Sequence, residues 1–298
     1  MTRRPAAPPR ILLTGASGQI GAAVAAAAPA AWRIDRPARA DLDLSAPEAI
    51  GAFLRDRDYD LILNAGAYTA VDKAESERAA VWRVNAEAPA ALASAARLAD
   101  TPVIHLSTDY VFDGAKGAPY VEDDPIGPIN VYGAAKAAGE LAVRAASPRN
   151  VVLRTAWVFS PRGTNFVKTM LRLARERAEI GVVSDQIGSP TGADDVALAL
   201  VRVCGRLLDE KAEGGVYHFV NSGEASWFEV AEAVLATLRA RGGPTPRLKA
   251  ITTADYPTPA RRPANSRLAT GRFQATFDLQ SRDWRQALEA VCAQLLPL

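Results

Sequence analysis

The sequence predicts an α/β protein with a doubly wound parallel (Rossmann) sheet and a smaller mixed C-terminal domain. Short apolar runs alternate with helical segments through the first half of the chain. The first run ends in a glycine-rich turn that opens a helix, and after Val158 the alternation gives way to turns and prolines. Because strands that alternate with helices are joined by right-handed crossovers, we expect a parallel sheet covered on both faces.

The expected strands are almost continuously apolar, as in a sheet whose two faces are both covered. They lie at residues 10–14, 32–35, 60–64, 103–106 and 151–154, with a late strand at 215–220. Helices are expected between them at residues 19–28, 47–57, 74–99 and 131–146, and further along at 166–176 and 227–238. The first helix is alanine-rich and stops at Pro29, because proline lacks the backbone N–H that a continuing helix needs.

Composition excludes several classes of function. The chain has 298 residues and a net charge of +2, which leaves no basic stripe for a nucleic acid, and no apolar run approaches the ~20 residues of a membrane helix. Cys204 and Cys292 lie far apart, and His105 and His218 do not cluster with them, so neither a zinc site nor a disulfide framework is indicated. We therefore expect a reduced, cytoplasmic protein with no nucleic-acid or membrane partner.

The glycine-rich turn after the first strand predicts a dinucleotide site. Its residues are Gly15, Gly18, Gln19, Ile20 and Gly21. Glycines at these positions permit a tight turn and a close backbone approach, while the start of the following helix presents amide groups to a pyrophosphate. The alternative is a turn with only a structural role.

The end of the second strand bears on the choice of coenzyme. Asp35 lies about 20 residues after Gly15, where a carboxylate accepts the ribose hydroxyls of NAD. Arg36 follows directly, and its guanidinium could instead bind the 2′-phosphate of NADP. NADH and NADPH both stay open, as does a solvated pair of surface charges.

Two further segments are expected near the coenzyme. Gly66, Ala67 and Tyr68 follow the third strand, where small residues let a cofactor pass close to the backbone. Asp43 and Leu44 precede the second helix and could bracket an adenine, although Asp43 and Ser45 are also plausible caps for that helix.

Tyr132 and Lys136 form the most informative pair. One helical turn separates them, so they share a helix face, and the lysine ammonium can stabilise the tyrosine phenolate. Ser107 and Thr108 end the fourth core strand, at the edge where open α/β sheets bind ligands. Together these residues predict a proton-transfer device.

The chain divides into two units on this pattern. Residues 10–160, with a returning segment near 193–222, are assigned to a dinucleotide-binding domain, and residues 161–192 and 223–298 to a smaller substrate-binding domain. Residues 1–9 contain arginines and prolines but lack the apolar stretch of a secretory signal, so we expect a short disordered tail.

Seven patches in order carry a family resemblance. They are Gly15-x-x-Gly18-Gln19-x-Gly21, the stretch from Asn64 to Glu75, Ser107 through Gly114, Tyr132-Gly133-x-x-Lys136, Arg154-Thr155-x-Trp157-Val158-Phe159, Asp185-Gln186-x-Gly188-x-Pro190-Thr191, and Arg262-Pro263-x-Asn265-Ser266-x-Leu268. The chain resembles the extended short-chain dehydrogenase/reductase superfamily and, within it, the dTDP-4-dehydrorhamnose reductases, from about Ile11 to near the C-terminus.

The resemblance implies a reaction and roles. NADPH or NADH would reduce the C4 carbonyl of dTDP-4-dehydro-6-deoxy-L-mannose to give dTDP-L-rhamnose. Tyr132 would protonate the developing alkoxide, Lys136 would lower the phenol's pKa and bind the nicotinamide ribose, and Thr108 would orient the sugar oxygen. His105 is expected to pack beneath the site rather than act in it.

Contacts with the dTDP-sugar are also implied by the resemblance. Asp109 would contact the sugar, and Trp157 would supply an apolar face, with a core role as the alternative. Asn165, Gln186 and Arg262 would meet sugar or diphosphate groups, since a guanidinium pairs with two phosphate oxygens.

One position departs from the family, and two rival functions stay open. Members that dimerise through a divalent cation tend to carry an acidic residue where this chain has Ala23, so we expect no required metal and a monomer or weak homodimer. The rivals are a nucleotide-sugar epimerase or dehydratase that retains its NAD, and a non-catalytic regulatory subunit on the same fold.

Overall fold

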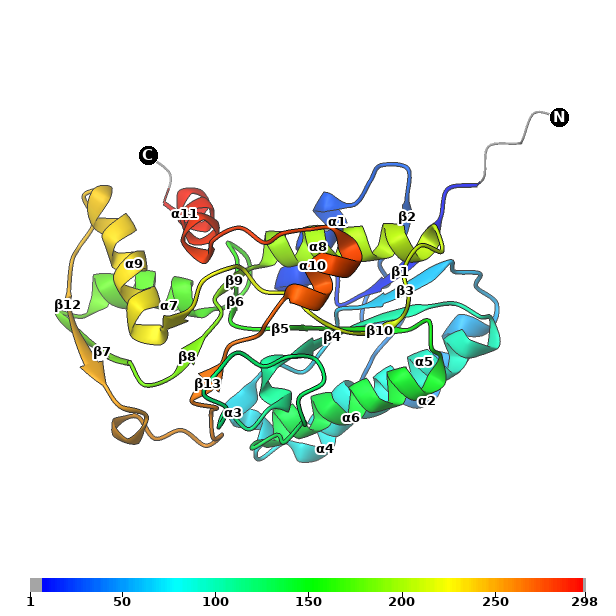
Figure 1. Ribbon diagram of the computed structural model, residues 1–298, viewed down its shortest axis with the longest axis horizontal. Helices are drawn as coiled ribbons and strands as arrows, with labels where there is room; N and C mark the ends of the chain where they lie inside the picture. Colours follow the sequence, from blue (N-terminus) through cyan, green and yellow to red (C-terminus); the bar gives the residue numbers. More distant parts are fainter. Residues whose placement is uncertain (1–6, 297–298) are drawn as a thin grey trace.

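The computed structural model describes residues 7–296 and is built on a six-stranded parallel sheet (Figure 1). The strand order is β10-β5-β4-β3-β1-β2. The strands are β1 (Arg10–Thr14), β2 (Arg33–Asp35), β3 (Leu61–Asn64), β4 (Val103–Thr108), β5 (Val151–Thr155) and β10 (Gly215–His218). The predicted doubly wound parallel sheet is confirmed.

Helices cover both faces of this sheet (Figure 1). On one face lie α1 (Gln19–Ala27), α8 (Ala193–Leu208) and α10 (Gly271–Phe277), and on the other α2 (Pro47–Arg55), α5 (Ala88–Leu98) and α6 (Val131–Ala146). Leu13 packs in the first layer and Leu12 in the second, because successive strand residues point to opposite faces. The continuous apolar runs of the strands follow from this double coverage.

The long helical segment expected at residues 74–99 is broken in the structure. It consists of α3 (Val71–Ala74), α4 (Arg78–Trp82), a π-helical turn (Arg83–Glu87) and α5. Within the π-helical turn, the Asn85 side chain accepts a hydrogen bond from the Tyr68 N–H (2.8 Å) and donates one to the Tyr68 carbonyl (2.9 Å). The irregular turn therefore fixes the loop that follows β3.

A second hydrophobic core forms beside the sheet. It includes α7 (Phe166–Glu176), α9 (Trp227–Ala240), α11 (Trp284–Leu295) and the parallel pair of β7 (Glu179–Val183) with β12 (Arg247–Ile251). Short strands link this region to the sheet: β6 (Val158–Phe159) pairs with β9 (Thr191–Gly192), and β8 (Ile187–Gly188) with β11 (Ala225–Ser226) and β13 (Asn265–Ser266). The predicted division into two units remains a proposal, with one amendment: Phe273 and Phe277 of α10 pack in the core of the large sheet.

The chain termini bear on two other predictions. Residues 1–6 of the expected disordered tail lie outside the described residues, whereas the Pro9 carbonyl accepts a hydrogen bond from the Arg33 N–H (2.9 Å) at the start of the sheet. Within residues 7–296, no helix has both the length and the apolar character needed to span a bilayer.

A buried ion pair ties β5 to α6. Arg154 donates to Glu140 through Nε (2.9 Å) and Nη2 (2.7 Å), and the two side chains are only 3% and 2% exposed. The guanidinium also lies 5.0 Å from the centre of the Phe112 ring. Since α6 carries Tyr132 and Lys136, this pair helps to hold the helix of the candidate site against the sheet.

We predict that Glu140→Ala destabilises the protein by about 3–5 kcal/mol, because it leaves the Arg154 charge buried without a partner. Urea unfolding would measure the loss. Glu48→Ala is the matched control, since it breaks the exposed pair with Arg83 and should cost about 0–1 kcal/mol. Equal losses from the two variants would contradict the prediction.

Candidate active site

The loop between β1 and α1 has the shape expected of a dinucleotide cradle. Gly15 has φ +67°, and a Cβ there would lie 2.5 Å from the Gly66 nitrogen. At Gly21 a Cβ would lie 2.2 Å from the Gly15 carbonyl oxygen. Gly18 is the N-cap residue of α1 and has no side chain, so no side-chain cap accepts hydrogen bonds from the first backbone amides of the helix. Glycine at position 15 therefore lets the loop after β1 pack directly against the backbone of the loop after β3.

Gln19 and Ile20, the other predicted members of the loop, begin α1 and differ in environment. The Gln19 side-chain oxygen accepts hydrogen bonds from Ser160 Oγ (3.0 Å) and Asn165 Nδ2 (2.8 Å). Ile20 packs against the core of the large sheet. Asn165, which we expected near the sugar or diphosphate, therefore lies beside the coenzyme loop and caps α7.

The end of β2 is more constrained than the sequence indicates. Asp35 Oδ2 accepts from Arg10 Nη2 (2.6 Å) and from the Tyr59 hydroxyl (3.1 Å), and burial raises the pKa of Tyr59 to about 12. Arg36 is exposed and, with Asp35, lines an open cavity of about 520 Å³. The Asp35 carboxylate is thus paired with the Arg10 charge and hydrogen-bonded to the neutral Tyr59 phenol.

The remaining predicted coenzyme residues lie in two adjoining loops. Leu44 lies against Gly66, where an added Cβ would come within 2.4 Å of Leu44 Cδ1. Asp43 accepts from the Ser45 N–H (2.8 Å), but the cap residue of α2 is Ala46, so Asp43 does not cap that helix directly. Tyr68, next to Ala67, is held by the Asn85 contacts described above.

Tyr132 is placed by the close approach of α6 to the turn after β4. Asn130 caps α6 by accepting from the Gly133 N–H (2.7 Å). A Cβ at Gly133 would lie 2.1 Å from the Tyr110 carbonyl oxygen, so glycine is needed for the contact. The Tyr132 ring meets that of Tyr110 edge-on, with the ring centres 5.8 Å apart. The contact places Tyr132 beside the turn that follows Thr108.

Lys136 lies on the same helix as Tyr132, one turn further on, and contacts the sheet. Its Nζ donates to the Leu106 carbonyl (2.5 Å) and lies 3.3 Å from His105 Nε2, and burial lowers the pKa of Lys136 to about 8. Burial raises the pKa of Tyr132 to about 12, although the neighbouring Thr108 hydroxyl lowers it in part. The ammonium is hydrogen-bonded to the Leu106 carbonyl, and its effect on the Tyr132 pKa stays a prediction.

A row of buried polar side chains reaches Lys136 from the sheet. Thr14 donates to Asn64 Oδ1 (2.6 Å), and Asn64 Nδ2 lies 3.0 Å from His105 Nδ1. Burial and the Lys136 charge lower the pKa of His105 well below its ordinary value, so the ring is neutral. His105 packs beneath the site as expected, but its contact with Lys136 was missed. The signal was available, since Thr14, Asn64 and His105 are polar residues in register on adjacent apolar strands.

Asp109 lies at the centre of the site and is only 3% exposed. Its Oδ1 accepts from Thr108 Oγ1 (2.9 Å), while its Oδ2 has no hydrogen-bond partner among the described residues. Ser107 Oγ and Thr155 Oγ1 are also buried without a partner there. Buried polar atoms left unpaired at the carboxyl edge of a parallel sheet indicate where a ligand contributes the missing bonds.

The other expected substrate residues already have protein partners. Both terminal nitrogens of Arg262 donate to Asp72 (3.0 and 2.8 Å), so a diphosphate would compete with this ion pair. Gln186 Nε2 donates to Thr253 Oγ1 (3.1 Å). Trp157 stacks on Trp227 with ring centres 3.6 Å apart, which fits the core role left open for it. Asp72 was not singled out by sequence, although it lies in one of the matching patches.

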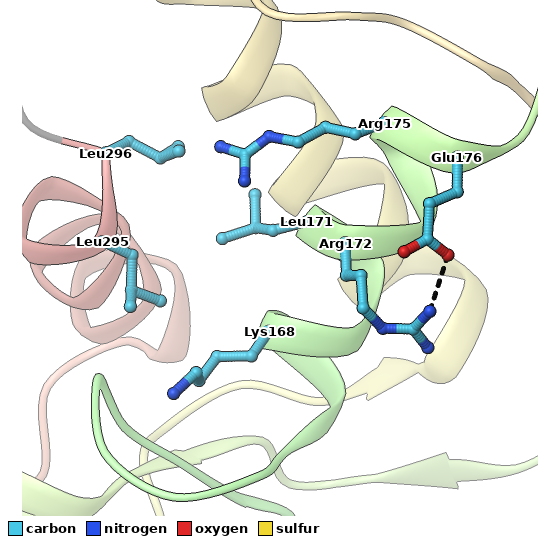
Figure 2. A pocket seen from close by; sticks show the side chains of 7 residues that line it. All are labelled: Lys168, Leu171, Arg172, Arg175, Glu176, Leu295 and Leu296. Atoms are coloured by element: carbon cyan, nitrogen blue, oxygen red, sulfur yellow. Dashed lines mark hydrogen bonds and ion pairs between the residues drawn. The ribbon is translucent and has the colours of Figure 1, made fainter.

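A separate cavity of about 370 Å³ lies between α7 and α11, and Figure 2 shows its lining. Leu171, Leu295 and Leu296 form its apolar part, and Lys168, Arg172, Arg175 and Glu176 form its charged part. Figure 2 also shows that Arg172 pairs with Glu176. None of the predicted site residues lines this cavity.

No group of three or more His, Cys, Asp or Glu side chains within residues 7–296 is arranged to hold a metal ion. Ala23, at the position of the family's acidic residue, packs against the core of the large sheet. Independence from metal and the monomeric or weakly dimeric state stay predictions.

Comparison with known proteins identifies the family. A model of the RmlD substrate binding domain matches residues 9–296. A dTDP-4-dehydrorhamnose reductase from Sinorhizobium fredii is 44% identical over 289 residues, covering 96% of this chain and 98% of that protein. One from Burkholderia thailandensis is 43% identical over 295 residues, covering 96% and 99%. The chain belongs to the dTDP-4-dehydrorhamnose reductase family.

A solved structure extends this likeness to three dimensions. The dTDP-4-dehydrorhamnose reductase from Bacillus anthracis in complex with NADP has a TM-score of 0.89 at 32% identity, covering 96% of this chain and 99% of that one. The predicted membership of the dTDP-4-dehydrorhamnose reductase family is confirmed, and with it the expectation of an NAD(P)H-dependent oxidoreductase.

For this member of the reductase family we predict that Gly21→Ala weakens NADPH binding about 10-fold or more, because the added Cβ would clash with the Gly15 carbonyl. Fluorescence titration with NADPH would measure the affinity. Gly51→Ala is the matched control, since nothing lies within 4 Å of a Cβ there. Wild-type affinity in Gly21→Ala would refute the assignment of the loop.

Proposed function

We propose that this protein catalyses the NAD(P)H-dependent reduction of the C4 carbonyl of dTDP-4-dehydro-6-deoxy-L-mannose (dTDP-4-dehydrorhamnose) to dTDP-L-rhamnose. The observation that carries the proposal is the position of the Tyr132 phenol, beside Thr108 at the carboxyl edge of the sheet and one helical turn from the buried Lys136. The names of its relatives supply the substrate.

The residues around the first loop fit a nicotinamide coenzyme. Gly15 and Gly21 exclude side chains from the turn, and the uncapped start of α1 offers amides to a pyrophosphate. When bound, the coenzyme supplies the hydride. The chain's own contribution to the chemistry then lies with the residues on β4 and α6.

Tyr132 donates a proton to the carbonyl oxygen as negative charge develops there, which contributes about 10²–10⁴-fold to the rate. Thr108 lies beside the phenol, where its hydroxyl would orient the sugar oxygen for the transfer. Lys136 lies on the same face of α6 as Tyr132, and its ammonium donates a hydrogen bond to the Leu106 carbonyl of β4. A cation held in this position stabilises the phenolate that forms when Tyr132 gives up its proton.

The proposal is tested by supplying the dTDP-4-keto-6-deoxyhexose, the partner 3,5-epimerase and NADPH, and by identifying the product sugar. We expect stoichiometric NADPH oxidation and dTDP-L-rhamnose. We also expect Tyr132→Phe to lower kcat by about 10²–10⁴-fold with NADPH affinity unchanged, because only the acid is lost. Turnover without net NADPH consumption would favour an epimerase or dehydratase, and a fully active Tyr132→Phe would overturn the mechanism.

We further propose that NADPH is the preferred coenzyme. Asp35 would repel a 2′-phosphate if its charge were free, but Arg10 and Tyr59 both donate to it. The neighbouring Arg36 is exposed and shares a cavity with Asp35. A guanidinium there suits a phosphate, because it donates two parallel hydrogen bonds. The NADP in the Bacillus anthracis structure is consistent with this choice.

We predict that Arg36→Ala lowers kcat/KM for NADPH by about 10-fold or more and leaves the value for NADH within about twofold, since a charge-assisted bond is worth about 1.5–3 kcal/mol. Steady-state rates with both coenzymes would give the ratio. Arg55→Ala, exposed on α2 outside the cavity, is the control and should not change it. Equal losses with NADH and NADPH would exclude a contact with the 2′-phosphate.

A further inference from the structure

A row of buried polar side chains crosses the large sheet and ends at Lys136. Thr14, Asn64 and His105 are buried partners in register on β1, β3 and β4. Thr14 Oγ1 lies 2.6 Å from Asn64 Oδ1, and Asn64 Nδ2 lies 3.0 Å from His105 Nδ1. The other ring nitrogen, Nε2, lies 3.3 Å from Lys136 Nζ. The row therefore joins the end of β1, where the coenzyme loop begins, to the lysine of the candidate site.

Each member of the row can both donate and accept hydrogen bonds. A hydroxyl has one proton and two acceptor positions, an amide has a donor end and an acceptor end of nearly the same shape, and a neutral imidazole carries its proton on either nitrogen. His105 is neutral, because burial and the Lys136 charge keep its pKa well below the ordinary value. The hydrogen bonds can therefore run toward Lys136 or away from it, with only a half-turn of the Asn64 amide.

The direction of the row depends on whether Lys136 is an amine or an ammonium. When Asn64 donates to Nδ1 of His105, the ring proton lies on Nε2 and is donated to Lys136, which accepts only as the neutral amine. An ammonium has three donors and no acceptor position, so it needs a bare Nε2. The ring proton then lies on Nδ1, and the Asn64 oxygen accepts it. The ring keeps one proton in both cases, and the proton that Lys136 gains comes from solvent.

The surroundings of Lys136 leave both protonation states within reach. Its side chain is buried, and burial lowers the pKa of Lys136 to about 8. Glu140, one turn further along α6, raises that pKa, but its carboxylate is paired with Arg154 of β5. Asp109, in the turn after β4, adds to the effect of burial on the pKa of Tyr132.

We propose that His105 is a positioning residue for Lys136 and holds its nitrogen in both protonation states, while the hydrogen bonds of Asn64 and Thr14 reverse to match. This inference rests on the proposed role of Lys136 in the reductase reaction. The Leu106 carbonyl supplies a second fixed contact, since it accepts from the ammonium and from the amine alike. Two contacts from β4 thus keep the flexible lysine side chain on the face of α6 that carries Tyr132.

Nitrogen-15 NMR reads the tautomer of His105 directly and does not need activity. The chain contains two histidines, so the loss of signals in His105→Gln assigns the ring. We expect the ring proton on Nδ1 below about pH 8 and on Nε2 above it, because Lys136 loses its proton there. Lys136→Met is the matched control, since it removes the titrating group, and its ring proton should keep one position. A single tautomer in wild type across this range, or the same change in Lys136→Met, would overturn the proposal.

The kinetic test compares His105→Leu with His105→Gln. Leucine removes the contact with Lys136, whereas a glutamine amide reaches the position of Nε2 and can donate or accept there. We expect His105→Leu to lower kcat by about 10-fold or more. The alkaline limb of kcat, where the Lys136 ammonium is lost, should move to lower pH by about one unit, because the ammonium loses a charge-assisted bond and the amine only a weaker one. His105→Gln should keep kcat within about threefold of wild type and leave the limb in place.

The two substitutions separate positioning from packing. Equal losses in His105→Leu and His105→Gln would mean that the ring only fills space in the core. A wild-type kcat and pH profile in His105→Leu would mean that the ring does not position Lys136. Either result would overturn the proposal. A tautomer change that follows Lys136, in a protein that does not reduce the 4-keto sugar, would instead reject the proposed function alone.

Discussion

The close approach of α6 to two neighbouring backbones is the contact on which the site depends. Gly133 lies against the Tyr110 carbonyl and Gly139 against the Asn85 carbonyl, and a Cβ at either would come within 2.2 Å of that oxygen. Tyr132 and Lys136 lie on the stretch of helix that these two glycines press inward. The positions of Tyr132 and Lys136 therefore depend on the absence of side chains at Gly133 and Gly139.

Local spacing explains what the sequence could predict. The glycine loop, the Tyr132–Lys136 pair and the bounds of α6 and α7 depend on residues near one another in the chain, and all were predicted. The direction of the Tyr132 pKa shift depends on burial, and the acceptor of the Lys136 ammonium depends on how α6 packs on β4. Only the folded structure supplies both. The pairing of Arg262 with Asp72 joins residues 190 positions apart, beyond the reach of any local pattern.

Buried ionisable groups in the core are either paired with an opposite charge or kept neutral. Arg154 and Glu140 are buried together, whereas His105 stays neutral beside the Lys136 ammonium. Asp35 is held at the rim by Arg10 and Tyr59. Each arrangement avoids an isolated buried charge, whose desolvation would cost several kcal/mol. Asp109 differs, because one of its oxygens is buried without a partner in the described chain, and such a group is costly unless it serves a function.

The place of α10 in the large core has a consequence for how the chain matures on the ribosome. Strand β10 completes the sheet by pairing with β5, and Phe273 and Phe277 then close the core over it. The nucleotide-binding half therefore cannot finish folding while its own residues emerge, and must wait for nearly the whole chain. Pairings this distant slow folding and leave apolar surface uncovered during synthesis, when chaperones would be most needed.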